Sequence, residues 1–540
     1  MKFPLRLLLI ASIVALLIVA SSQVVDGHSK NSTYTNPILP SWHSDPSCTF
    51  VKEWDNTAFC VTSTNAFERP SRMPELGSIV RQQHGLFAAM IQYHDNSFYV
   101  IVTLQSENNA TGLIFTSPNL YDGTTWSMPT NFTMYGIDPD IFWEDDGKVY
   151  VSSNLYGTTI GLVVVDPVTG SQTTPTPIWN GTGGSSPEGP HIYKKDRYYY
   201  LMIAEGGTQL GHMETIARST NITGPYEEYE NNLILTNTNT TEYFRTVGHA
   251  DLFQDESDNW WGVALATRSG QEHMSYPMGR ETVLYPVTWK EGDWPTLQPV
   301  RGEMSGWPLP PINKGIPGAG AFVDDPDDYD FVPGSLLPLH FMSWRYLPTN
   351  AVIVSPHDNP HTLQINLSRA NLTGDANSTD PTSFIGRRQT HTLFDFSVNV
   401  FFIPLLAEKE AGVTVFLTQY QHVDLGIVLL SSSSGTLTQF FRFRITSVWN
   451  DSSRGSSGRE DECDLGIAPA SIVSGGTGPY TGKYCTQIDV IEYLLITFSG
   501  ALLGPYPTTN GGAGTTTAAY ISEWRYEGAA QYVGNGEYVY

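Results

Sequence analysis

The chain has 540 residues and a mass of 59.7 kDa, which exceeds one ordinary hydrophobic core and predicts two or more domains. Apolar residues make up 40% and aromatic residues 12%, so a largely disordered chain is excluded. With 49 Gly, 35 Pro and only 15% charged residues, the composition favours many turns and few long helices, which indicates a β-rich protein. The formal net charge of −25 repels phosphate backbones and argues against a nucleic-acid partner, but it does not oppose an uncharged ligand.

The segment from Met1 to Ser22 has the pattern of a secretory signal peptide. Lys2 and Arg6 are basic, residues 7–20 are apolar, and the small residues Ser21 and Ser22 follow. An apolar run of this length falls short of the roughly 20 residues that span a bilayer, which argues against a membrane anchor. No later segment is apolar enough to span, so we expect a secreted, extracellular protein without membrane contact after signal cleavage.

Ten N-x-S/T sequons agree with export, because their number exceeds what occasional chance matches would give. The sequence therefore predicts a glycoprotein. The sequons begin at Asn31, Asn109, Asn131, Asn180, Asn221, Asn239, Asn366, Asn371, Asn377 and Asn450.

The four cysteines form two pairs that are close in sequence, Cys48 with Cys60 and Cys463 with Cys485. In an oxidising compartment this spacing predicts one local disulfide in each half of the chain. Neither pair has the C-x-x-C spacing or the clustered histidines of a metal site, so a cysteine-bound metal is not expected.

A polar turn followed by an aromatic-rich strand recurs five times in the first half of the chain. Asp, Asn and Gly suit tight hairpins, and a hairpin every 40–50 residues or so without helical periodicity is typical of β-propeller blades. A β-sandwich, the alternative, has turns every 8–12 residues or so without the longer period. The repeat predicts five blades, and its first step is the shortest. The turn aspartates are Asp55, Asp95, Asp146, Asp196 and Asp258.

Four of the repeats carry a titratable residue 8 to 10 positions before the turn: Asp45, Asp138, Glu188 and His249. The matching segment of the second repeat, residues 87–90, is apolar. Equivalent positions of a radial repeat lie on a ring, so three carboxyls and one imidazole are predicted to meet in one cavity. Taken singly, an Asp-Pro sequence is an ordinary turn and a lone histidine is more often part of the core.

Six short motifs follow one another along residues 34–300. They are Asn36-Pro37-Ile38-Leu39-Pro40 with Asp45-Pro46-Ser47, Gly136-Ile137-Asp138-Pro139, Glu188-Gly189-Pro190-His191, Ala204-Glu205-Gly206-Gly207-Thr208, Gly248-His249-Ala250-Asp251 and Gly279-Arg280-Glu281-Thr282. In this order they resemble the motifs of glycoside hydrolase family 43. The sequence is similar to the fungal β-xylosidase and α-L-arabinofuranosidase type of that family, which has a C-terminal concanavalin A-like β-sandwich.

The resemblance implies a five-bladed catalytic propeller and hydrolysis by a single inverting displacement. Matched motif by motif, Asp45 is the general base and Glu188 the general acid. Asp138 orients the acid and raises its pKa by like-charge proximity, because a glutamic acid at its ordinary pKa of about 4.3 would be ionised and unable to donate a proton.

Further residues follow from the same resemblance. Arg280 is expected to donate hydrogen bonds to substrate hydroxyls. His249 is expected in the central channel near a water molecule or a calcium ion, the one metal that the resemblance allows. No cofactor is required. Phe87 and Trp42 could each stack on a sugar ring or belong to the core.

Composition divides the rest of the chain. Residues 30–305 form the predicted propeller, residues 306–335 are rich in Pro, Gly and Asp and are predicted to be a linker, and residues 336–540 resemble the C-terminal sandwich. The sandwich could bind carbohydrate or support the propeller. We expect support, since domains that share a chain often pack together.

The first repeat is short. Residues 64–67 run directly into Glu68, where relatives of this type have roughly two dozen more residues, about a strand pair and its turn. Either the first blade is abbreviated or coding sequence has been lost.

Taken together, we expect a monomeric, secreted, exo-acting hydrolase that releases terminal xylose or arabinofuranose from arabinoxylan or xylo-oligosaccharides. The alternative is a non-catalytic, carbohydrate-binding propeller with a defective first blade.

Overall fold

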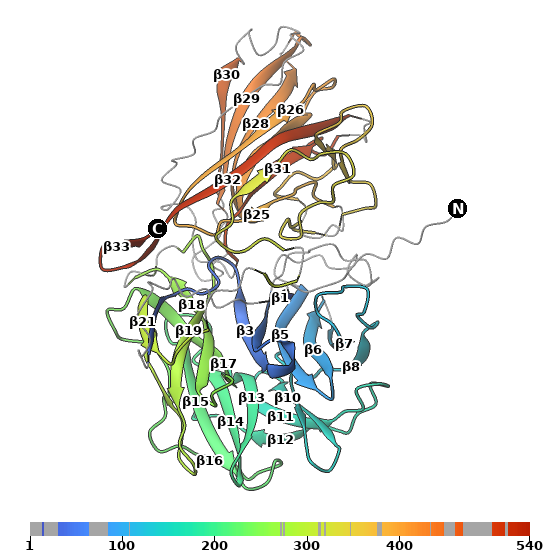
Figure 1. The fold of residues 1–540 in the computed structure, drawn as a ribbon. Helices are drawn as coiled ribbons and strands as arrows, with labels where there is room; N and C mark the ends of the chain where they lie inside the picture. The colour runs from blue at the N-terminus through green and yellow to red at the C-terminus, as the bar shows by residue number, and fades with distance from the viewer. Residues whose placement is uncertain are drawn as a thin grey trace.

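The structure is a computed structural model of the chain (Figure 1). It describes residues 13–15, 31–63, 85–106, 109–270, 273, 276–310, 315–317, 320–345, 347–374, 381–431, 434–447, 459–467, 499–512 and 517–540. These residues contain strands and one 3-10 turn, Lys52–Trp54, but no α-helix, so the predicted all-β class is confirmed. Within the same ranges, no helix has the length and apolar character needed to cross a bilayer.

Five antiparallel sheets follow one another along the first part of the chain, the lower body in Figure 1. Each sheet begins with its inner strand. The strands are β3(Ser44–Val51) and β4(Thr57–Ser63); β5(Gly85–His94), β6(Ser97–Gln105), β7(Ala110–Ser117) and β8(Thr130–Thr133); β9(Asp140–Trp143), β10(Val149–Leu155), β11(Thr159–Val164) and β12(Thr176–Trp179); β13(Glu188–Lys195), β14(Tyr198–Glu205), β15(Met213–Ser219) and β16(Glu227–Glu228); β17(Phe244–Gln254), β18(Trp260–Arg268), β19(Glu281–Thr288) and β20(Thr296–Leu297).

The inner strands close into a ring. Strand β3 contacts β5, β5 contacts β9, β9 contacts β13, β13 contacts β17, and β17 contacts β3. The strands β2(Ser32–Thr35) and β21(Glu303–Gly306) pair with each other and so join the two ends of this region. This closed, radial order is the arrangement of a propeller, and it brings the inner strands of all five sheets around one axis.

The predicted turns have the conformation that their residues favour. Asp55, Asp95, Asp196 and Asp258 all have positive φ, between 48° and 60°, and Gly147 takes the equivalent conformation in the third turn with φ 82°. Asp and Asn tolerate this left-handed region better than other side chains, and Gly adopts it freely. The recurring turns of the sequence are therefore hairpin turns.

The first sheet differs from the other four. After β3 and β4, its third strand is β1(Ile13–Ala15), which pairs with β4 and comes from the segment interpreted as a signal peptide. The remaining residues of that segment, and residues 64–84 where the shortening was inferred, lie outside the described residues. The predicted disulfide between Cys48 and Cys60 is present and joins β3 to β4. Cys485 lies outside the described residues.

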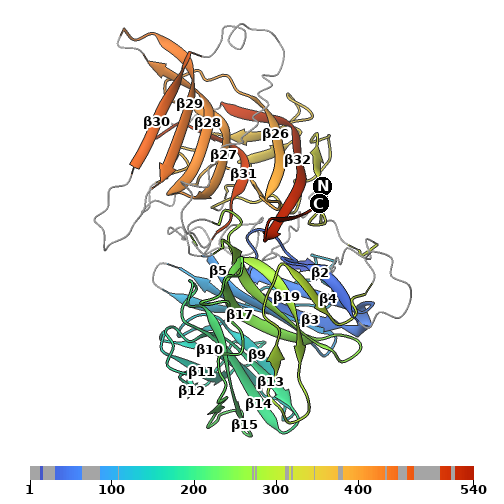
Figure 2. The same cartoon turned by 90° about the vertical axis from the view of Figure 1, so that its left-hand side faces the viewer.

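The second part is a sandwich of two six-stranded sheets, the upper body in Figures 1 and 2. The predicted linker is shorter than expected, because β22 lies within residues 306–335 and pairs with β32 as part of the sandwich. One sheet contains β22(Asp327–Tyr329), β23(Val352–Val354), β24(Leu363–Asn366), β26(Leu393–Phe401), β32(Ala518–Gly534) and β33(Glu537–Val539); the other contains β25(Arg387–Arg388), β27(Glu410–Thr418), β28(Gln421–Ser431), β29(Leu437–Ser447), β30(Arg459–Ile467) and β31(Leu502–Thr508).

The sandwich is packed onto the propeller through specific contacts. The backbone N–H of Ala501 donates to the carbonyl of Pro277 at 2.7 Å. Arg268 Nη1 donates to the carbonyl of Tyr532 at 3.0 Å, near the end of β32 that reaches the propeller in Figure 2. The sandwich therefore supports the propeller, as expected from the sequence.

Candidate active site

The inner strands are irregular at matching places. Register shifts interrupt β3 between Ser44 and Ser47, β5 between Phe87 and Met90, β13 between Glu188 and His191, and β17 between Gly248 and Asp251. One residue in each interruption has positive φ, and Asp138 has the same conformation just before β9. These five mouth positions are Asp45 (φ 50°), Ala88 (φ 43°), Asp138 (φ 61°), Gly189 (φ 54°) and His249 (φ 49°).

This alignment corrects one detail of the sequence-based prediction. Glu188 is not equivalent to Asp45, Asp138 and His249, because the matching residue of its strand is Gly189. A glycine suits this position, since it has positive φ and a Cβ atom on Gly189 would lie close to the ring of His249, at 3.0 Å. Glu188 therefore lies one residue before the mouth position of β13.

The mouth positions surround one small pocket. Asp45, Ala88, Asp138, Gly189 and His249 all line it. The pocket lies at the point where the five inner strands meet, as the repeat predicted. Other lining residues are Pro46, Ser47, Ala89, Met90, Pro139, Pro190 and His191.

Asp45 is kept ionised. Burial alone would raise its pKa, but Arg280, His249 and the hydroxyl group of Ser63 together hold the pKa of Asp45 below its ordinary value. Arg280 Nη1 lies 3.3 Å from Asp45 Oδ1, His249 Nδ1 lies 3.6 Å from the same oxygen, and Ser63 Oγ donates to Oδ2. A carboxylate held in this state can accept a proton from water.

Glu188 is shifted in the opposite direction. Burial and the Asp45 carboxylate raise the pKa of Glu188 to about 7, although Arg280 opposes the shift. Burial, Glu188 and Asp45 also hold the pKa of Asp138 well above its ordinary value, and the backbone N–H of Gly189 donates to Asp138 Oδ2 at 3.1 Å. Asp138 and Glu188 therefore interact directly through their charges and compete for protons.

His249 is buried next to Asp45, and burial lowers its pKa to about 4, so the imidazole is neutral at pH 7. The part of the chain that the structure describes contains no group of three or more His, Cys, Asp or Glu side chains arranged to hold a metal ion. A calcium ion near His249, which the resemblance allows, therefore stays a prediction.

A second polar ring, which the sequence analysis did not assign, lies two residues below the mouth positions. Ser47 Oγ donates to Asp251 Oδ2 at 2.8 Å, and His191 Nδ1 lies 3.3 Å from Asp140 Oδ1 and 3.6 Å from Asp251 Oδ1. Burial alone would lower the pKa of His191, but the two carboxylates raise it to about 9. The repeat contained the signal, since Ser47, Asp140, His191 and Asp251 each follow their mouth position by two residues.

Trp42 does not face the pocket. Its side chain is 1% exposed and packs in a cluster of sandwich residues, with its ring 5.9 Å from that of Trp344. The interpretation of Trp42 as a sugar-stacking residue is therefore wrong, and the core alternative holds. Arg388 Nε of the sandwich donates to the carbonyl of Trp42 at 3.0 Å. Phe87 is half-buried next to Ala88, and its contact with substrate stays a prediction.

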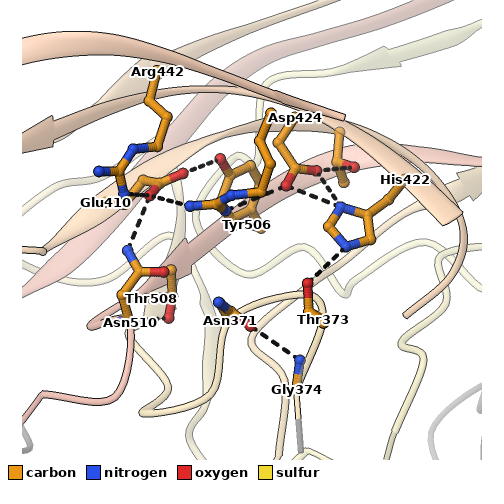
Figure 3. A network of polar contacts seen from close by, with 12 residues as sticks. Asn371, Thr373, Gly374, Glu410, His422, Asp424, Arg442, Tyr506, Thr508 and Asn510 are labelled. Carbon is orange, nitrogen blue, oxygen red and sulfur yellow. Dashed lines mark hydrogen bonds and ion pairs between the residues drawn. The ribbon is translucent and has the colours of Figure 1, made fainter. Parts of the chain in front are cut away.

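The sandwich has a buried polar network of its own (Figure 3). Glu410 accepts hydrogen bonds from Tyr506, Arg442, Arg444 and Asn510. Further contacts join the same sheet: Arg444 lies 3.5 Å from Asp424, and His422 Nδ1 lies 2.9 Å from Asp424 Oδ1. Glu410, Asp424 and His422 have fully buried side chains, and each carboxylate has a cationic neighbour. Buried charges that are paired in this way hold the strands of the sheet together.

Two carboxyls that interact at the propeller mouth thus differ in state: Asp45, which lines the pocket, is held ionised, and Glu188, which is not one of the lining residues, has a raised pKa. A group that takes a proton beside a group that gives one is the arrangement that hydrolysis of a glycosidic bond requires. These features define a glycoside hydrolase. The sequence profile described as glycosyl hydrolases family 43 matches residues 34–295, and that of the β-xylosidase C-terminal concanavalin A-like domain matches residues 328–444.

Relatives cover both parts of the chain. A non-reducing end α-L-arabinofuranosidase of Bacteroides ovatus is 30% identical over 519 residues, 90% of this chain and 94% of the relative. A xylosidase/arabinosidase of Butyrivibrio fibrisolvens is 31% identical over 67% of this chain and 70% of its own. The solved structure of the xyloglucan PUL GH43B protein of Bacteroides ovatus has a TM-score of 0.72 at 29% identity and covers 92% of this chain and 99% of its own. The chain belongs to glycoside hydrolase family 43 and is an O-glycosyl hydrolase.

Proposed function

We propose that this protein is a secreted, exo-acting hydrolase of arabinoxylan and xylan that releases terminal xylose or arabinofuranose with inversion of configuration. The observation that carries the proposal is the opposite displacement of the pKa values of two interacting carboxyls, that of Asp45 downward and that of Glu188 upward to about 7. The substrate class is supported by the relatives, whose names describe xylosidases and arabinofuranosidases.

The mechanism assigns one step to each group. Glu188 donates its proton to the leaving oxygen, while Asp45 removes a proton from the water that attacks the opposite face of the sugar. Arg280 keeps Asp45 ionised and is placed to donate to substrate hydroxyls beside it. The acid ends the step ionised and the base protonated, so water restores both groups before the next turnover.

Product release from arabinoxylan and from xylo-oligosaccharides tests the activity. We expect the full chain to release a single pentose, and the variants Asp45→Asn and Glu188→Gln to lose about 10²–10⁴-fold in kcat. The anomeric configuration of the first-formed sugar, followed by proton NMR, tests inversion. Retention would contradict the single displacement, and release of longer oligosaccharides would contradict exo action.

Export has a separate test. Mass spectrometry of protein recovered from a culture medium should show a mature chain that lacks the segment from Met1 to Ser22 and carries sugar on exposed sequons. Retention of Met1 in extracellular protein would contradict a cleaved signal. Family membership argues against the non-catalytic alternative, which rests on the short first blade. A folded wild-type chain that binds xylan but releases no sugar would favour that alternative.

A further inference from the structure

The backbone that leads to Glu188 is folded around a second, fully buried carboxylate, that of Glu205 at the end of β14. Thr182 and Gly184 donate their backbone N–H groups to it at distances between 2.9 and 3.1 Å, and Thr182 Oγ1 donates at 2.9 Å. Thr215 Oγ1 of the neighbouring strand β15 donates at 2.6 Å. Four donors therefore satisfy one carboxylate that has no exposed surface.

The loop of residues 181–185 is shaped to fit this carboxylate closely. A Cβ atom on Gly181 would lie 2.4 Å from Glu205 Oε1, and one on Gly184 would lie 2.9 Å from it. The backbone N–H of Gly206, next to Glu205, donates to the carbonyl of Ser185 at 2.8 Å. The loop then reaches Glu188, which pairs across the sheet with Ala204, the residue before Glu205.

A second residue joins the acid to Asp138. Asn154, at the end of β10, donates from Nδ2 to the carbonyl of Pro187 at 2.6 Å, directly before Glu188. Its backbone N–H donates to the carbonyl of Ile137 at 3.0 Å, directly before Asp138. One buried residue thus holds together the two backbone segments that deliver the interacting carboxyls.

We propose that Glu205 and Asn154 are positioning residues for the general acid, Glu205 by fixing the loop that precedes Glu188 and Asn154 by fixing the spacing of Glu188 from Asp138. The inference rests on the proposed function. Proton donation requires the acid at hydrogen-bond distance from the leaving oxygen, and a displacement of about 1 Å can cost about 100-fold in rate. Neither residue touches the pocket, so each acts through the backbone of others.

The test uses the dependence of the rate on the leaving group. Glu205→Gln keeps the shape but replaces one acceptor oxygen by a donor, and Asn154→Asp keeps Oδ1 for the N–H of Gly157 but removes the Nδ2 donor. We expect kcat on xylo-oligosaccharides or arabinoxylan to fall about 10- to 100-fold. On a nitrophenyl pentoside, whose leaving group departs without protonation, kcat should fall less than about 3-fold.

Asp255→Asn is the matched control. Asp255 accepts four hydrogen bonds, from Ser257, Asn259 (twice) and Trp261, at the hairpin turn after β17. This variant should affect both substrates equally. If Glu205→Gln does not fold, Thr215→Val removes one donor to Glu205 and carries the same test.

The outcomes separate the two proposals. A wild-type chain that cleaves neither substrate overturns the proposed function. An active wild type whose Glu205 and Asn154 variants lose the same factor on both substrates, or lose nothing, overturns the positioning role. A loss restricted to the substrate with the poor leaving group supports it.

Discussion

Two clusters of buried charge, one in each part of the molecule, differ in how their charges are balanced. The propeller mouth gathers the carboxyls of Asp45, Asp138 and Glu188 near the guanidinium of Arg280. The sandwich cluster sets two carboxylates against two guanidiniums. Burial and the excess of acidic groups raise the pKa values of Asp138 and Glu188, whereas the oppositely charged groups of the sandwich cluster hold each other in place.

The largest effect on stability is expected when one charge is removed from the sandwich cluster. Glu410→Gln leaves Arg442 and Arg444 with a neutral neighbour in a buried site, which should cost about 3–5 kcal/mol of unfolding free energy. Denaturant unfolding measures the loss. The rate per folded molecule should not change, because the cluster lies outside the pocket.

Glu527→Gln, an exposed change in the same domain, is the control and should alter stability by less than about 0.5 kcal/mol. A Glu410→Gln variant as stable as the control would show that the network does not stabilise the sandwich.

Replacing a glutamate by glutamine at the propeller mouth should instead increase the free energy of unfolding. The pKa of Glu188 is about 7 in the folded chain, above its ordinary value of 4.5. Above pH 7 the carboxyl is ionised in both states, but only in the folded state does its ionisation cost free energy, so Glu188 lowers the stability of the folded protein there. Glu188→Gln should therefore stabilise the protein by about 3 kcal/mol at pH 8. The gain should shrink from pH 7 downward and vanish below about pH 4.5.

Unfolding of wild type and variant at pH 4, 6 and 8 checks this sign. A variant less stable than wild type at pH 8 would contradict the prediction, because it would show that the ionised Glu188 carboxylate makes favourable contacts in the folded protein.

The smallest expected effect concerns Arg280, the cation at the propeller mouth. Replacing Arg280 by Gln removes a neighbouring positive charge from Asp45, so the pKa of Asp45 should rise. The acidic limb of the kcat/KM profile should move upward by the same amount. Arg218→Gln, a change in β15 where the guanidinium lies over the ring of Trp294 and not in the pocket, should leave the profile in place. An unmoved acidic limb in Arg280→Gln would mean that another group ionises there.

The sequence allowed the fold and the three carboxyls to be predicted because both depend on local patterns. Turn residues such as Asp95 set a hairpin wherever they occur, and the Asp-Pro motifs repeat in register with those hairpins. The offset of Glu188 was missed because an irregular strand moves a residue by one position without changing its motif. Trp42 was ambiguous because its partners, such as Trp344, belong to the other domain and lie far away in the sequence. The positioning roles inferred for Glu205 and Asn154 were missed because they act through loop geometry: Glu205 belongs to one of the six motifs, but the motif does not show which backbone groups its carboxylate binds.

The burial of Trp42 has a consequence for engineering. Because this indole of the propeller is seated among side chains of the sandwich, a catalytic module cut out at residue 305 would expose a tryptophan close to its base. Such a truncated protein should aggregate more readily. A chimera with a different C-terminal domain would need an apolar surface on that domain that covers Trp42. In protein engineering, the propeller and the sandwich should therefore be transferred together.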